Sequence, residues 1–195
     1  MIFVTGGARS GKSGLAEKLA RERADSAVDS AGAMRAGAAF DGDGAAVTYI
    51  ATAEPKDGEM RERIAEHRER RPAGWRTVEA PDNLPEAVEE ALAGDGIVLI
   101  DCLTVYISNL LMNQGIASGE RVKRAVDREM DELVEVCRSG NGRVILVSNE
   151  VGMGIVPDNM LARTFRDVAG RANQKLAAAA DEVYLCVSGI PMKVK

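Results

Sequence analysis

The amino-acid sequence predicts an α/β fold in which a mostly parallel central sheet carries helices on both faces. Short runs rich in β-branched residues alternate along the chain with longer segments in which apolar residues recur every three or four positions. Each short run is apolar at nearly every position, as in strands that are buried on both faces. Strands that alternate strictly with helices are joined by crossover connections, and these make successive strands parallel.

The expected strands span residues 2–5, 47–51, 97–101, 144–148 and 183–187, and residues 192–195 can add a short edge strand. Between the first two strands, Leu15 and Leu19 mark the apolar face of a helix. Two later helices carry longer apolar faces, formed by Val122, Val126, Met130, Leu133 and Cys137 in one and by Leu161, Phe165, Val168, Ala172 and Leu176 in the other.

We predict a single domain over residues 1–195, because this length is that of one ordinary globular domain. One segment breaks the alternation of strands and helices. Residues 25–46 are rich in Ala, Gly and Asp and show little periodicity, so we expect a flexible connection between the first helix and the second strand. A tolerated surface insertion is the simplest interpretation of this segment.

Composition restricts the function classes. Hydrophobic residues at 46% and charged residues at 28% are typical of a soluble globular protein, and a net charge of −5 argues against a nucleic-acid binder. We expect neither a signal peptide nor a membrane span, and therefore a cytoplasmic protein. Cys102, Cys137 and Cys186 lack the spacing of a zinc site or a disulfide framework, so we expect them to pack as small hydrophobes.

The clearest functional motif is GGARSGKS, which follows the first predicted strand directly. It satisfies the phosphate-loop pattern G-x-x-x-x-G-K-[ST] through Gly6, Gly11, Lys12 and Ser13. In such a loop, backbone N–H groups surround a phosphate at a helix N-terminus, the lysine reaches the β- and γ-phosphates, and the hydroxyl ligates Mg²⁺. A glycine-rich turn can match this pattern by chance, but the strand before it and the helix after it favour a nucleotide site.

A phosphate-loop enzyme also needs a carboxylate near its metal ion, and Asp101 stands at the carboxyl end of a predicted strand. Open α/β sheets bind their ligands at that edge, so we expect Asp101 to hold magnesium, usually through water. Its alternative role is to cap a helix that starts near Thr104. We favour the metal role because a strand end that faces a triphosphate is a poor place for an idle carboxylate.

The only histidine of the chain, His67, lies in a predicted helix that begins at residue 57 or 58 and ends before Pro72. Met60 and Ile64 share one face with it, so the imidazole belongs to the apolar stripe. It can be a packed ring beside arginines that favour the helix dipole. It can also be a neutral nucleophile that attacks a nucleotide's α-phosphate while guanidinium groups neutralise the leaving pyrophosphate. Spacing alone does not choose between these interpretations.

Two further stretches lie where the fold places its ligands. SNEVGMGIVP, residues 148–157, begins at the carboxyl end of the fourth strand and brings Asn149, Glu150 and two glycines to that edge. GWRTVEAP, residues 74–81, contains the only tryptophan, Trp75, which can be a core anchor or a stacking platform. It also contains Glu79, a carboxylate able to accept hydrogen bonds from N1–H and the 2-amino group of guanine.

Four stretches together, VTGGARSGKS, YIATAEPKDGEMRERIAEHRERRPAGWRTVEAP, NEVGMGIVP and FRDVAGRANQKLAAAADEVYLCVSGIPMKVK, closely resemble the bifunctional adenosylcobinamide kinase/adenosylcobinamide-phosphate guanylyltransferase family of cobalamin biosynthesis. The resemblance covers nearly the whole chain except residues 25–46. Its most specific parts are the histidine helix and NEVGMGIVP. The resemblance implies a P-loop NTPase fold with a RecA-like core, and a homotrimer.

The resemblance implies two reactions on one scaffold. A nucleoside triphosphate, ATP or GTP, first phosphorylates the aminopropanol hydroxyl of adenosylcobinamide. GTP then guanylylates a histidine, and adenosylcobinamide phosphate takes the GMP group to give adenosyl-GDP-cobinamide. Two alternatives remain, namely a small-molecule P-loop kinase without the transferase step and a non-catalytic regulatory protein that uses nucleotide as a switch.

The resemblance also assigns roles to residues. His67 matches the GMP-accepting histidine, Lys12 is the second catalytic residue, and Ser13 and Asp101 would hold Mg²⁺. The nucleotide-binding positions are Gly6, Gly7, Ala8, Arg9, Ser10, Gly11, Lys12, Ser13, Ala51, Thr52, Ala53, Arg68, Glu69, Arg70, Arg71, Glu79 and Asp101. The chain departs from the family in two places. Some members carry a second histidine where this chain has Glu66, and the connection at residues 25–46 is longer than the family leads us to expect.

Overall fold

A computed structural model describes residues 1–32, 47–55, 58–113 and 120–195 of the chain. Its elements in order are β1 (Ile2–Gly6), α1 (Lys12–Gly32), β2 (Val47–Ala51), α2 (Gly58–Arg70), β3 (Arg76–Glu79), α3 (Leu84–Leu92), β4 (Ile97–Asp101), α4 (Leu103–Asn113), α5 (Glu120–Ser139), β5 (Val144–Asn149), α6 (Met160–Ala179), β6 (Glu182–Val187) and β7 (Ile190–Lys193).

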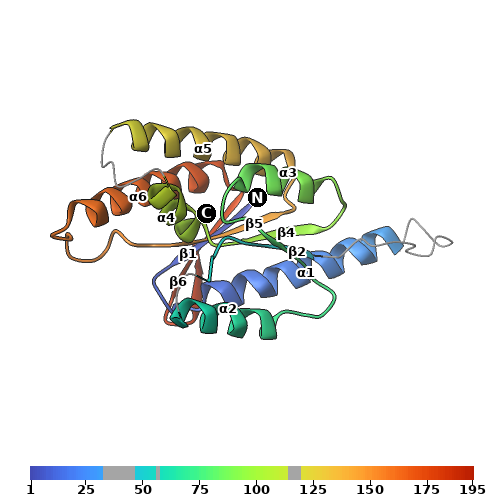
Figure 1. Cartoon of the computed structure of the whole chain (residues 1–195). Coiled ribbons are helices and arrows are strands. Elements are labelled where there is room, and N and C mark those ends of the chain that lie inside the picture. Colours follow the sequence, from blue (N-terminus) through green and yellow to red (C-terminus); the bar gives the residue numbers. More distant parts are fainter. Residues whose placement is uncertain (33–46, 56–57, 114–119) are drawn as a thin grey trace.

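The strands form one seven-stranded sheet in the order β3-β2-β4-β5-β1-β6-β7, which confirms the predicted α/β class. Strands β1 to β6 pair in parallel with their neighbours in this order, and β7 pairs antiparallel with β6 as an edge strand. Figure 1 shows α1 and α2 below the sheet and α3, α5 and α6 above it. The strand that leads into the phosphate loop, β1, therefore lies inside the sheet, in agreement with a P-loop NTPase fold.

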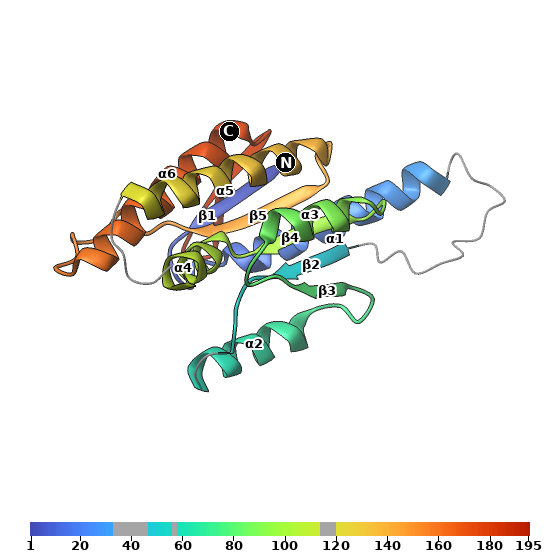
Figure 2. The ribbon, with the colours of Figure 1, turned by 45° about the horizontal axis from the view of Figure 1, so that its top comes forward.

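The first helix is longer than the sequence led us to expect. α1 continues to Gly32, so residues 25–32, which we assigned to a flexible connection, are helical. No proline or glycine interrupts the chain between Gly14 and Gly32, and alanine is frequent there, so helix propensity suffices without an apolar stripe. Figure 2 shows this end of α1 extending past the sheet, where no apolar face is needed. The rest of the proposed insertion, residues 33–46, lies outside the described residues.

Two elements between α2 and β4, the strand β3 and the helix α3, were not predicted from the sequence. β3 is an edge strand with mostly exposed side chains, so it carries no apolar run that would mark it. α3 is only nine residues long, and its buried residues are Leu84, Pro85 and Val88. Its sequence is also compatible with a polar loop, so it gave no clear helix signal. The edge strand predicted at residues 192–195 is present but shifted by two residues, and spans Ile190–Lys193.

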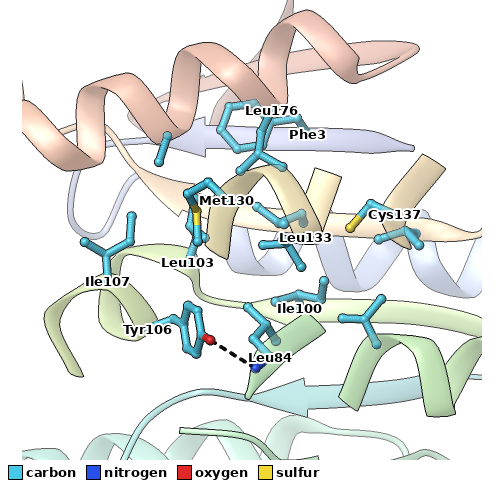
Figure 3. Close-up of a cluster of buried hydrophobic side chains, with 14 of the residues drawn as sticks. Phe3, Leu84, Ile100, Leu103, Tyr106, Ile107, Met130, Leu133, Cys137 and Leu176 are labelled. Carbon is cyan, nitrogen blue, oxygen red and sulfur yellow. Dashed lines mark hydrogen bonds between the residues drawn. The ribbon is translucent and has the colours of Figure 1, made fainter. Parts of the chain in front are cut away.

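Two clusters of buried side chains fill the space on the two faces of the sheet. Figure 3 shows the larger cluster, in which Leu133 of α5 and Leu176 of α6 approach Phe3 and Ile100 of the sheet. The smaller cluster packs α1 against the other face through Ala16 and Ala20. None of the helices in the described ranges has the length and apolar character needed to cross a membrane.

The three cysteines are buried and unpaired, as expected. Burial raises the pKa of the Cys137 thiol to about 12. Burial, with the nearby Asp101 carboxylate, raises that of Cys102 to about 11. The thiols therefore serve as small apolar side chains at neutral pH.

The phenol of Tyr106 provides a test of this packing. Its oxygen accepts a hydrogen bond from the backbone N–H of Leu84 at 3.1 Å, at the start of α3 (Figure 3). The same hydroxyl donates a hydrogen bond to Oε1 of Glu129. Tyr106→Phe leaves that buried N–H without an acceptor, so we expect the free energy of unfolding to fall by about 1–3 kcal/mol. Urea denaturation followed by circular dichroism measures it. Tyr184→Phe, which removes a half-buried hydroxyl bonded to Glu182, should change it far less; equal losses in both variants would contradict this account.

Candidate nucleotide site

The site forms where the parallel strands end. Strand register places Ala51 of β2 between Glu79 of β3 and Asp101 of β4. The two acidic residues thus stand two strand spacings apart, about 10 Å between Cα atoms. Gly6, at the end of β1, pairs with Asn149 of β5 at the same edge. The carboxyl edge of the sheet therefore gathers residues from four predicted motifs.

The phosphate loop joins the end of β1 to the start of α1. α1 begins at Lys12, so the loop backbone lies at a helix N-terminus, where N–H groups and the helix dipole favour an anion. Residues 7–9 are exposed, which leaves this part of the backbone open to a ligand. The Lys12 ammonium group is largely buried and donates to the carbonyl oxygen of Gly7 at 3.1 Å. The exposed loop backbone and the Lys12 side chain are thus arranged as a phosphate site requires.

Two glycines of this loop are required by their surroundings. A Cβ atom on Gly6 would lie 2.5 Å from the carbonyl oxygen of Cys186 in β6. Gly11 has a positive φ of 88°, which side chains rarely tolerate, and a Cβ there would lie 3.1 Å from Gly189. The backbone N–H of Gly189 donates to the carbonyl oxygen of Ser10 at 3.0 Å. The turn between β6 and β7 therefore packs directly against the phosphate loop and is hydrogen-bonded to it.

Asp101, the predicted metal carboxylate, is half-buried at the end of β4. Its Oδ2 accepts a hydrogen bond from the hydroxyl of Tyr49 at 3.0 Å. Burial, together with the negative charge of Asp101, raises the pKa of Tyr49, so the phenol stays protonated and acts as a donor. The first turn of α4 instead begins at Cys102, whose carbonyl oxygen accepts from the Tyr106 N–H at 3.2 Å. This hydrogen bonding does not support the alternative in which Asp101 caps the helix.

The predicted donors also suit magnesium. Ser13 lies in the first turn of α1 and is half-buried, so its hydroxyl belongs to the same phosphate-loop region. Mg²⁺ that arrives with a nucleotide keeps water and phosphate oxygens as ligands, so one hydroxyl and one carboxylate from the protein suffice. The described residues contain no cluster of three or more His, Cys, Asp or Glu side chains that would bind a metal without the nucleotide.

The stretch Ala51, Thr52 and Ala53 reaches the same edge, but its side chains differ in exposure. The Thr52 hydroxyl is fully buried; it donates to the Cys102 carbonyl oxygen at 2.8 Å and accepts from the Cys102 N–H at 3.0 Å. Thr52 thus joins β2 to β4, while Ala51 and Ala53 remain partly exposed. A ligand at this edge would meet these two alanines rather than the threonine side chain.

A second set of buried hydrogen bonds holds the start of NEVGMGIVP in place. Most of the residues that form it were not predicted from the sequence. The hydroxyl of Thr104 accepts from the Asn149 N–H at 2.7 Å, and the side-chain amide of Asn173 donates to the Asn149 carbonyl oxygen at 3.0 Å. Ser148 donates to Asn173 at 2.7 Å. These residues could have been found as polar positions within otherwise apolar stretches. Buried polar side chains are nearly always hydrogen-bonded, so such positions predict a buried hydrogen-bond network.

The helix that carries His67 is attached less closely than the other helices. Met60, Ile64 and His67 are half-buried, so the predicted shared face exists but does not belong to the core. Nδ1 of His67 is buried and has no hydrogen-bonding partner among the described residues. Figure 2 shows α2 standing apart from the sheet, beyond the edge strand β3. These positions are compatible both with a packed ring and with a nucleophile, so the burial of His67 does not choose between the two interpretations.

The arginines at the end of α2 contact the sheet edge. Arg68 forms an exposed ion pair with Glu79, so two predicted nucleotide-site residues contact each other. Arg71 donates to the hydroxyl of Thr77 at 3.2 Å, and its guanidinium carbon lies 3.5 Å from the centre of the Tyr49 ring. Glu69 is exposed, and the side chain of Arg70 lies outside what the structure describes.

Trp75 supports the interpretation as a core anchor. It is half-buried and packs against the cluster of side chains on the α1 face of the sheet. Arg21 of α1 lies over its ring, 5.8 Å from the ring centre.

A pocket of about 610 Å³ opens beside the phosphate loop. It is lined by residues of the phosphate loop, of the segment after β2, of α2, α4 and α6, and of the end of β5 with the segment that follows: Ala8, Glu54, Met60, Thr104, Val105, Ser108, Asn109, Met112, Asn149, Glu150, Val151 and Phe165. Met60 is part of this wall and His67 is not. The two residues are seven positions apart in one helix, which is about 10 Å along its axis.

Known proteins resemble this chain over nearly its whole length. A family model described as cobinamide kinase / cobinamide phosphate guanyltransferase matches residues 2–194. The bifunctional adenosylcobalamin biosynthesis protein CobU of Salmonella typhimurium strain LT2 is 45% identical over all of this chain and 99% of its own length. CobU of Escherichia coli K12 is 43% identical over 100% of this chain and 99% of its own. CobP of Pseudomonas aeruginosa PAO1 is 41% identical over 99% of this chain and 96% of its own.

Among solved structures, the P4 protein of bacteriophage phi6 in complex with ADP aligns with 97% of this chain and 52% of its own. The chain therefore spans about half the length of that protein. The identity is 12% and the TM-score is 0.40. This likeness is too distant to support any statement about function.

The close approach of Gly6 to β6 gives a test of the phosphate loop. Gly6→Ala forces the loop or β6 to shift, so we expect the affinity for GTP to fall by about tenfold or more, as for other losses of precise positioning. Gly14→Ala is the matched control, because a Cβ on Gly14 meets nothing within 4 Å. Equilibrium titration with a fluorescent GTP analogue measures both variants. Wild-type affinity in Gly6→Ala would show that the loop does not bind the phosphates.

Proposed function

The chain belongs to the cobinamide kinase / cobinamide phosphate guanyltransferase family, and on this premise we propose that it carries out both reactions in adenosylcobalamin biosynthesis. It phosphorylates the aminopropanol hydroxyl of adenosylcobinamide and then converts the product to adenosyl-GDP-cobinamide. The observation that carries the proposal is a complete phosphate loop at the end of β1, next to a pocket whose wall includes Met60 of α2, the helix that carries the only histidine. We further propose that the enzyme is a cytoplasmic homotrimer, as the resemblance implies.

In the kinase step, this chain binds and aligns the triphosphate of ATP or GTP. The backbone of residues 6–11 and the ammonium group of Lys12 surround the phosphates, and the N-terminus of α1 adds its dipole. Ser13 and Asp101 would hold Mg²⁺, which supplies further neutralisation of phosphate charge when bound. The loose transition state of phosphoryl transfer needs this charge neutralisation and alignment more than it needs covalent help.

In the transferase step, the imidazole of His67 attacks the α-phosphorus of GTP and forms a P–N bond as the bond to pyrophosphate breaks. The phosphate of adenosylcobinamide phosphate then attacks the same phosphorus, and the histidine leaves. An imidazole suits both halves because it is mostly neutral near pH 7 and is a good leaving group when protonated. Since Nδ1 of His67 is buried, Nε2 is the nitrogen we assign to the attack.

The two reactions need different contacts from α2. Met60 faces the pocket beside the phosphate loop, whereas His67 lies about 10 Å further along the helix axis. We propose that α2 turns about its attached C-terminal end to bring His67 to the α-phosphate, as hinged elements do on ligand binding. Its half-buried face is compatible with such a shift, because little apolar surface holds it.

The pocket beside the phosphate loop is the place we propose for the acceptor arm. Its walls include Val105, Met112 and Phe165, while Ser108 and Glu150 supply polar groups. The aminopropanol arm ends in a hydroxyl and a methyl group, so it suits a pocket with both kinds of wall. An acceptor that enters there would present its hydroxyl next to Ala8 of the phosphate loop.

The transferase step is tested by incubating the protein with GTP labelled at the α-phosphate and Mg²⁺. We expect an acid-labile, base-stable label on the protein, as a phosphorus–nitrogen bond requires, and no label on His67→Ala. A wild-type protein that binds GTP but takes up no label would overturn the transferase mechanism. Kinase activity without labelling would instead identify a small-molecule kinase, and binding without any turnover a regulatory protein.

The acceptor pocket is tested with Met112→Glu, which places a charge in its apolar wall. We expect the KM for adenosylcobinamide to rise by about tenfold or more, since a carboxylate must then be desolvated or displaced. Labelling of His67 by GTP should stay at the wild-type rate. Met160→Glu is the matched control, because Met160 is exposed to the same degree as Met112 (59% and 60%) but does not line the pocket. Equal KM values in both variants would exclude this location.

A further inference from the structure

Tyr49 stands between the two parts of the machinery. It lies on β2 and is only 2% exposed. Its hydroxyl donates to Oδ2 of Asp101 at 3.0 Å, and its ring faces the guanidinium of Arg71 at 3.5 Å from the ring centre. One buried side chain thus touches both the carboxylate of the predicted magnesium site and the residue that follows the histidine helix.

The contact with Asp101 restricts a carboxylate that is otherwise only half-buried. A carboxyl group at the end of a strand can rotate about its side-chain bonds, and each wrong rotamer removes an oxygen from the metal site. A hydrogen bond to one oxygen selects one orientation and leaves the other oxygen for a metal-bound water. Partners of this kind orient metal-ligating groups in proteins generally.

The contact with Arg71 holds the end of α2. Arg71 is four residues beyond His67, which is about one helical turn. Its Nε is buried and has no hydrogen-bonding partner among the described residues, and its guanidinium carbon lies 3.5 Å from the centre of the buried Tyr49 ring. The neighbouring contact, between Arg68 and Glu79, is more than half exposed on both sides and is screened by solvent. The Tyr49–Arg71 contact is therefore the stronger of the two attachments.

We propose that Tyr49 is a positioning residue with two separable roles. Its hydroxyl orients Asp101 for the metal–nucleotide complex, and its ring anchors the C-terminal end of the helix that presents His67. This inference rests on the proposed function, because both roles serve the reactions assigned above. It also explains why a tyrosine occupies a β2 position that is otherwise surrounded by apolar side chains.

Two substitutions separate the roles. Tyr49→Phe removes the hydroxyl and keeps the ring, whereas Tyr49→Leu removes both. For Tyr49→Phe we expect Mn²⁺ to bind about tenfold more weakly in the presence of a non-hydrolysable GTP analogue. Electron paramagnetic resonance of free Mn²⁺ measures this without turnover. The rate of His67 labelling at saturating metal should stay within about twofold of wild type, because the ring still holds Arg71.

For Tyr49→Leu we expect the same loss of Mn²⁺ affinity and, in addition, a loosened α2. Hydrogen–deuterium exchange of the α2 amides should be about tenfold faster than in Tyr49→Phe, since the last turn has lost its buried contact. The rate of His67 labelling should fall by a similar factor. The difference between the two variants isolates the ring, and Tyr49→Phe keeps the test decisive if Tyr49→Leu folds poorly.

Tyr184→Phe is the matched control. Its hydroxyl also donates to a carboxylate, Glu182 at 2.8 Å, but on β6 and away from Asp101. It should leave Mn²⁺ affinity, α2 exchange and labelling unchanged.

Wild-type Mn²⁺ affinity in Tyr49→Phe would overturn the role of the hydroxyl. Equal α2 exchange in Tyr49→Phe and Tyr49→Leu would overturn the role of the ring. If wild-type protein took up no GMP at all, the proposed function would be at fault. Normal wild-type labelling with unchanged Tyr49 variants would refute this inference alone.

Discussion

The structure depends on the parallel pairing of β1 between β5 and β6. This pairing sets Gly6 so close to Cys186 that only a hydrogen fits between them, and it fixes where the phosphate loop leaves the sheet. Because the neighbouring strands run the same way, their carboxyl ends reach the same edge, and so do Asp101, Glu79 and Asn149. The nucleotide site is therefore a consequence of strand direction first and of individual side chains second.

Buried hydrogen bonds stiffen that edge where the strands end and backbone groups lose their sheet partners. Thr52 closes the gap between β2 and β4, and Thr104 with Asn173 holds the backbone of Asn149. An unpaired polar group here would cost about 1–3 kcal/mol, so each bond keeps the local path of the chain well defined. α2 contrasts with this, since its apolar face is only half-buried and its attachments gather near its C-terminal end. The sheet edge and α2 thus differ in how much of their surface is buried.

Much of the fold was predictable because buried parallel strands and long amphipathic helices carry strong periodic signals. The strand bounds at β2 and β4 agree with the sequence prediction, and the phosphate loop has the expected strand and helix beside it. β3 was not predicted because an exposed edge strand has no apolar run. The helical state of residues 25–32 was not predicted because that end of α1 is not covered by the core. Glu79 and Arg68 were both assigned to the nucleotide, but their mutual ion pair depends on how α2 folds back over β3, which local sequence does not encode. In the sequence, Tyr49 looks like one more residue of an apolar strand. Its contact with Asp101 could not be predicted, because only the register of β2 against β4 brings its hydroxyl to that carboxylate.

The chain is acidic overall, with a net charge of −5, yet it must hold a highly charged nucleotide. The positive groups assigned to the nucleotide are local ones, at the N-terminus of α1, at Lys12 and at the end of α2. At the end of α2, Arg68 and Arg71 already have partners within the chain, so a phosphate bound there would have to compete with Glu79 and Tyr49 for them. The exposed pair of Arg68 with Glu79 contributes at most about 1 kcal/mol and yields easily, whereas Arg71 is packed against a buried ring. On the proposed function, Arg68 would thus turn to a nucleotide before Arg71, whose contact with Tyr49 would keep the end of the helix on the sheet.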